Sequence, residues 1–122
     1  MDIALWVVQL LTAVVFLGGA YVHAVAYEQS KARIVWLSAV GRRGALVIAI
    51  LEALGAIGLV LPLATNTLVW LTPIAALGLA LLMLCAVPFH IARREWTNII
   101  VNTVLGALAA FVAFGRWDLL GR

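Results

Sequence analysis

The sequence predicts an all-α protein, a four-helix transmembrane bundle with a short interfacial helix between the first two spans. Hydrophobic residues make up 66% of the 122 positions and charged residues only 11%, whereas soluble domains contain roughly 45–50% apolar and 25% charged residues. Four apolar stretches are each long enough to cross a hydrocarbon core of roughly 30 Å. The length of the chain fits a single transmembrane domain, residues 1–122.

The four spans follow one another with short or moderate connections. We expect them at about residues 3–26, 44–64, 68–90 and 97–115. The first stretch is too long for the apolar region of a signal peptide and follows Asp2 with no basic segment, so we expect a retained helix. The turn-forming pair Thr65-Asn66 closes the second span, and Thr72-Pro73 is typical of the first turn of a helix.

The connection between the first two spans contains the expected interfacial segment, at about residues 30–41. Its apolar core, Ile34–Leu37, is too short to span and is flanked by basic residues, which favours a helix lying in the membrane plane. Tryptophans fall at the predicted helix ends, where an aromatic belt is expected. They are Trp6, Trp36, Trp70, Trp96 and Trp117.

The distribution of basic residues predicts the orientation. Segments 28–43 and 91–96 together carry six Lys and Arg residues, against Arg116 and Arg122 on the opposite side. Because basic loops stay in the cytoplasm, we expect a multi-pass protein of the cytoplasmic (inner) membrane. Both termini should lie outside, and segments 28–43 and 91–96 should be cytoplasmic.

Glu52 is the most informative residue for function. It lies inside the second span, and no other Asp, Glu, Lys, Arg or His occurs between Arg43 and His90. A charged side chain at the middle of a bilayer costs at least ~2.5–3.5 kcal/mol on insertion scales. Two interpretations stay open: a functional carboxyl group, or a neutral one that hydrogen bonds between helices, with Asn102 as the first candidate partner and His23 as the next.

Helical spacing and depth place further polar residues near Glu52. At 1.5 Å per residue, Glu52 is about 12 Å and Asn102 roughly 8 Å from the cytoplasmic ends of their spans. His23, His90 and Asn98 lie at the same edge. These residues predict a pocket open to the cytoplasmic leaflet, which could hold a lipid or quinone-like head group or relay a proton. The alternative for the two histidines is a position among lipid head groups. We expect the remaining polar and small positions of the inward faces to serve helix packing: Gln9, Gly55, Gly58 and Gly106.

Other classes of function lack a motif. The sequence has no glycine-rich phosphate loop, nucleophile motif or nucleic-acid-binding stripe, and its histidine and cysteine spacings do not indicate a metal. The lone Cys85 excludes an intramolecular disulfide and is expected to be a buried apolar residue. We therefore predict no catalytic constellation, no metal, no intrinsic cofactor and no nucleic-acid partner. The expected partners are the bilayer and other membrane subunits or further copies of the chain.

Several segments resemble the DoxX-like family of small four-helix bacterial and archaeal membrane proteins. The most specific is Ile50–Pro62, with Leu-Glu-x-Leu-Gly-Ala-x-Gly-Leu before the proline; the others are Trp70–Ala80, Phe89–Glu95 and Asn102–Arg116. Through this resemblance, Glu52, His90 and Asn102 fall on polar positions typical of the family. The chain departs at His23, where similar proteins usually carry Lys, and at Ala49, where Gly is common.

The resemblance implies an accessory or assembly subunit of a larger redox or energy-transducing membrane complex. Some relatives are associated with quinone-linked sulfur oxidation. Because the chain has no ligand set for haem, flavin or an iron–sulfur cluster, we do not expect it to be a redox catalyst by itself. The alternative is a small proton-coupled transporter using Glu52, although proteins resembling small multidrug transporters carry that carboxylate in the first helix.

Overall fold

The computed structural model describes residues 2–121, which are almost entirely helical and contain no strand. The elements are α1 (Asp2–Ala24), α2 (Tyr27–Ser30), α3 (Val35–Ala64), α4 (Leu71–Ala92), α5 (Trp96–Gly115) and the 3-10 helix η1 (Trp117–Gly121). Helices α1, α3, α4 and α5 are each long and apolar enough to cross a membrane. The predicted all-α class with four transmembrane helices is confirmed.

Two helices begin at residues other than those expected, because of backbone conformations that the sequence pattern does not show. Helix α3 begins at Val35, well before residue 44, because residues 35–40 are already helical and bend into the long segment at Gly41. Gly41 has φ 77° and ψ 176°, a conformation open essentially to glycine alone. Helix α4 begins at Leu71 and not at 68, because Asn66 and Leu68 both have positive φ in the hairpin that precedes it.

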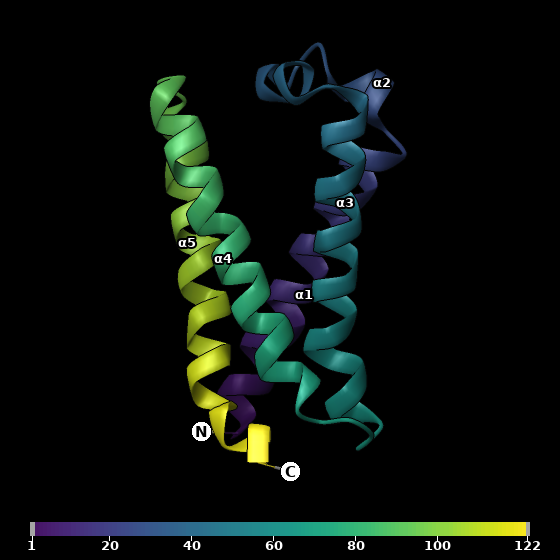
Figure 1. Ribbon diagram of the computed structural model, residues 1–122, viewed down its shortest axis with the longest axis vertical. Helices are drawn as coiled ribbons and strands as arrows, with labels where there is room; N and C mark the ends of the chain where they lie inside the picture. Colours follow the sequence, from purple (N-terminus) through teal and green to yellow (C-terminus); the bar gives the residue numbers. More distant parts are fainter. Residues whose placement is uncertain (1, 122) are drawn as a thin grey trace.

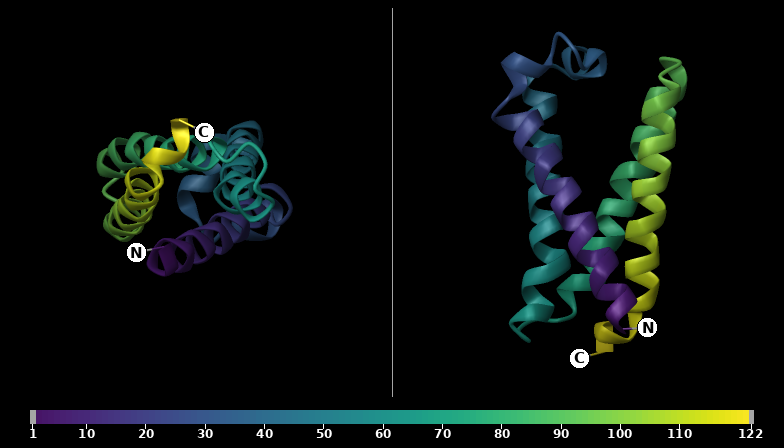
Figure 2. Two further views of the ribbon diagram at one scale, coloured as in Figure 1. Left: turned by 90° about the horizontal axis from the view of Figure 1, so that it is seen from below. Right: turned by 180° about the vertical axis from the view of Figure 1, so that it is seen from behind.

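The four long helices form two antiparallel pairs that diverge toward one end (Figures 1 and 2). Helix α1 packs along α3, and α4 packs along α5. The pairs meet at the end that holds the α3–α4 hairpin and the two ends of the described chain. The other end holds α2, the short helical segment 35–40 and the α4–α5 turn, and in Figure 1 that segment extends from the end of α3 toward the α4–α5 pair.

Small residues allow the pairs to meet closely. A Cβ atom added at Gly58 of α3 would lie 2.6 Å from the Cβ of Ala75 on α4, and one added at Gly55 would overlap Leu79. Phe16, Leu59 and Val112 complete a core to which all four long helices contribute. The outward faces remain apolar and exposed, as contact with lipid requires.

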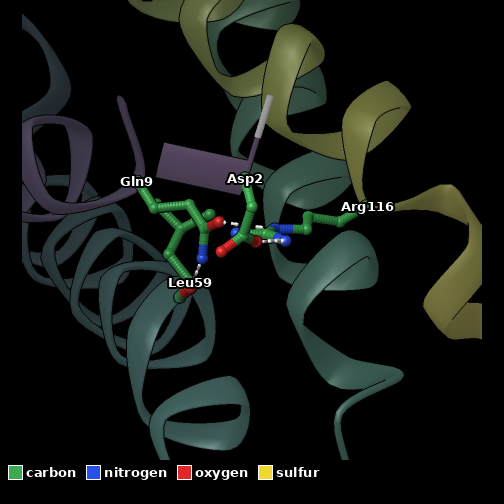
Figure 3. Close-up of polar contacts among 4 residues, drawn as sticks. All are labelled: Asp2, Gln9, Leu59 and Arg116. Atoms are coloured by element: carbon green, nitrogen blue, oxygen red, sulfur yellow. Dashed lines mark hydrogen bonds and ion pairs between the residues drawn. The ribbon is translucent and has the colours of Figure 1, made fainter. Parts of the chain in front are cut away.

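A polar cluster fastens the end at which the pairs meet (Figure 3). Arg116 follows α5 and is only 8% exposed. From the charge pattern alone, it would be expected to lie in solvent outside the spans. Its Nε donates to Oε1 of Gln9 at 2.7 Å, and its Nη1 pairs with Asp2 at 2.5 Å. Gln9 in turn donates from Nε2 to the carbonyl of Leu59 on α3 at 2.6 Å. Gln9 thus connects α1 to both α3 and the end of α5.

Candidate functional site

A cavity of about 520 Å³ lies between the two helix pairs where they diverge. Ligand sites in proteins usually have volumes of about 300–1,000 Å³. All five residues that the sequence nominates line this one cavity: His23, Glu52, His90, Asn98 and Asn102. They come from α1, α3, α4 and α5. The structure therefore brings the nominated residues together, and their use in binding or proton transfer stays a prediction.

Glu52 forms its hydrogen bond with His23. Oε1 of Glu52 lies 2.6 Å from Nδ1 of His23, and the carboxyl group is buried. The preference for Asn102 as the partner is wrong: no hydrogen bond joins Asn102 to Glu52 in the described chain. Close packing of α1 on α3 brings His23 to the carboxylate, whereas Asn102 belongs to α5 of the other pair.

Gly19 makes room for this contact. It lies one helical turn before His23, and a Cβ atom added there would be only 2.9 Å from Oε2 of Glu52. The absence of a side chain lets the carboxyl group lie against the backbone of α1. His23, at the position where similar proteins usually carry Lys, also supplies a nitrogen atom that pairs with Glu52.

His90 is held by a second carboxylate. Its Nδ1 lies 2.7 Å from Oε1 of Glu95, which also receives a hydrogen bond from Nε of Arg93 at 3.2 Å. Burial alone would raise the pKa of Glu95, but the hydrogen bonds from His90 and Arg93 outweigh it and lower that pKa. The ionised carboxylate therefore fixes the His90 ring at the cavity wall.

Trp36 lines the cavity and contacts both histidines. Its ring centroid lies 5.0 Å from that of His23 and 5.6 Å from that of His90, both in edge-to-face contact. The sequence predicts Trp36 only as an interfacial anchor. The bend at Gly41, which no hydropathy pattern reveals, turns the short helical segment so that Trp36 reaches both pairs.

Basic residues in and next to the connection between α1 and α3 hold it in place. Arg42 donates to the carbonyl of Ala24 at 2.7 Å and lies over the ring of Tyr27. Lys31 pairs with Glu28 at 2.8 Å. The hydrogen bond and charge of this pair lower the pKa of Glu28 and raise that of Lys31.

The cavity wall is otherwise apolar. Phe16, Met83 and Phe89 line it together with aliphatic side chains, and no Lys or Arg is among its lining residues. Cys85 also lines it and is exposed, so the expectation of a buried cysteine is wrong. Within residues 2–121, no group of three or more His, Cys, Asp or Glu side chains could hold a metal ion. The site offers hydrogen bonding and an apolar surface.

Comparison with known proteins establishes the family. No curated protein and no solved structure matches the chain. The sequence pattern of the DoxX-like family matches residues 7–112, a range that includes every polar residue nominated for the cavity. Together with the four apolar helices, this match shows that the chain is a membrane protein of the DoxX-like family.

Proposed function

We propose that the protein is an accessory or assembly subunit of a larger membrane complex and that it binds a lipid or quinone-like head group beside Glu52. The observation that carries this proposal is the cavity, in which the His23–Glu52 pair and two asparagines face an otherwise apolar space. Apolar walls with a few convergent polar groups are typical of sites for amphipathic molecules.

The position of the cavity also suits a molecule with an apolar tail. Val15 of α1 and Val101 of α5 line the cavity and are themselves about half exposed, at 49% and 47%. The cavity therefore reaches the lipid-facing surface between these helices. A head group can lie near Glu52 while its tail extends into the bilayer.

The orientation inferred from charge indicates the leaflet from which the head group would enter. Lys31, Arg42 and Arg93 all lie at the end where the helix pairs diverge, and basic connections favour the cytoplasmic side. The head group would then enter from the cytoplasmic leaflet of the inner membrane, with both termini outside.

Isolation of the protein in native membrane discs tests this proposal. We expect other membrane subunits to co-purify in a fixed ratio and one amphipathic molecule to be enriched over the bulk lipid. Isolation of the chain without other subunits, surrounded by lipid of bulk composition, would contradict it. Cross-linking before extraction controls for the loss of weakly held subunits.

Proton-coupled transport is the second candidate, favoured by a hydrogen-bonded carboxyl–imidazole pair inside the cavity. Reconstituted vesicles with an internal pH dye distinguish the two functions. A proton flux that requires a second solute and disappears in Glu52→Gln would favour transport. No flux under any gradient would favour the subunit.

A further inference from the structure

We propose that the cavity selects an uncharged amphiphile whose head group carries a hydroxyl. This inference rests on the proposed head-group binding and narrows it to one chemical class. Three features support it: the hydrogen bond between His90 and Glu95, the amides of α5 that form no hydrogen bond, and the absence of basic side chains from the wall.

The first feature is that both histidines contact a carboxylate through the same ring nitrogen. Nδ1 of His23 faces Glu52 and Nδ1 of His90 faces Glu95. The ionised Glu95 only accepts hydrogen bonds, so Nδ1 of His90 carries the proton, and in a neutral ring Nε2 is then an acceptor. Within residues 2–121 no hydrogen bond engages Nε2 of either ring. The His90 ring in the cavity wall therefore offers an acceptor that suits an O–H group.

The second feature is the pair of amides on α5. Asn98 and Asn102 line the cavity, and neither side chain forms a hydrogen bond in the described chain. An amide nitrogen can donate to the oxygen of the same hydroxyl that donates to an imidazole. A hydroxyl satisfies both kinds of group at once, whereas an ether or a ketone can only accept.

The third feature is the charge of the lining. Its one carboxyl group belongs to Glu52, and no Lys or Arg accompanies it. An anionic head group would enter an apolar space without a cation, which is unfavourable. Because Glu52 is already paired with His23, a cationic head group would have to displace the imidazole.

Cys85 provides the measurement, because it is the chain's sole cysteine, is exposed and lines the cavity. Its rate of labelling by N-ethylmaleimide is followed at pH 8 in lipid discs with increasing amounts of four probes. These are a 4-alkylphenol, its methyl ether, a fatty acid of equal chain length and the matching trimethylammonium. A fifth probe, an alkanol, shows whether an aliphatic hydroxyl protects Cys85 as well as a phenolic one does.

We expect the phenol or the alkanol to slow labelling about tenfold at about ten times its dissociation constant. The methyl ether should bind about 3- to 20-fold more weakly, the value of a hydrogen bond inside a membrane protein. As a control, a cysteine placed at the lipid-facing Val104, in a Cys85→Ser background, should label equally with and without probe.

Substitution of His90 tests whether its Nε2 is the acceptor. In His90→Asn the amide nitrogen takes the place of Nδ1 and keeps the bond to Glu95, but the Nε2 acceptor is lost. We expect that variant to lose the preference for phenol over ether. His90→Gln, which keeps a polar atom at the position of Nε2, should retain part of it.

The outcomes separate this inference from the proposed function. Equal protection by phenol and ether, or stronger protection by the fatty acid or the trimethylammonium, would overturn the hydroxyl assignment while leaving head-group binding in place. Absence of protection by every probe would overturn both.

Discussion

Replacing Gln9 with alanine should destabilise the bundle, because Gln9 connects three segments at the end where the helix pairs meet. The substitution removes the bond to the Leu59 carbonyl and the bond from Arg116. Interhelical hydrogen bonds in membrane proteins contribute ~0.6 kcal/mol on average and up to ~1.7 kcal/mol. Two such bonds predict a loss of about 1–3 kcal/mol. Nη2 of Arg116 is already buried without a partner, so losing the bond at Nε favours the upper half of that range.

The free energy of unfolding in mixed micelles, followed by circular dichroism and by steric trapping, measures this loss. Gln29→Ala is the matched control, because Gln29 is the only other glutamine and is exposed outside the long helices. Equal unfolding free energies for the two variants would refute the argument that Gln9 holds the pairs together.

Two further predictions concern the opposite end of the bundle, and a third concerns the orientation of the chain in the membrane. Glu95→Gln should remove an acid-sensitive part of the stability. The pKa of Glu95 is lowered on folding, so its stabilising contribution is present above the usual value of 4.5 and is lost as the pH falls. The free energy of unfolding measured from pH 7 to 3 will detect this loss in the wild type and its absence in the variant. Gly41→Ala should cost about 1–3 kcal/mol through backbone strain, whereas Gly18→Ala, with open space around it, should not; equal stabilities would contradict this. Single cysteines at Asp118 and Arg93, in a cysteine-free background, should react with an impermeant reagent from outside only at residue 118.

Much of the architecture could be predicted because it depends on local properties. The four long helices follow from apolar length, and the shared cavity follows from helical spacing and depth along each span. Glu52 and Asn102 line one cavity because both occur at similar depth on inward faces. Neither inference requires knowledge of which helices are neighbours.

The features that could not be predicted depend on contacts between distant segments. The partner of Glu52 is decided by the packing of α1 on α3, which leaves Asn102 on the other pair. The role of Trp36 depends on the bend at Gly41. Similarly, the burial of Arg116 depends on Gln9 and Asp2, more than 100 residues earlier in the chain. A hydropathy pattern contains no information on these pairings.

Filling the cavity tests the central claim most directly. Val101 and Val104 both lie on α5 and are about half exposed, at 47% and 52%, but only Val101 lines the cavity. Native mass spectrometry of protein released from its own membrane will compare Val101→Trp with Val104→Trp. We predict that wild type and Val104→Trp retain one amphipathic molecule per chain, whereas Val101→Trp does not. Retention of the same molecule by both variants, or by none of the three proteins, would contradict a head-group site beside Glu52.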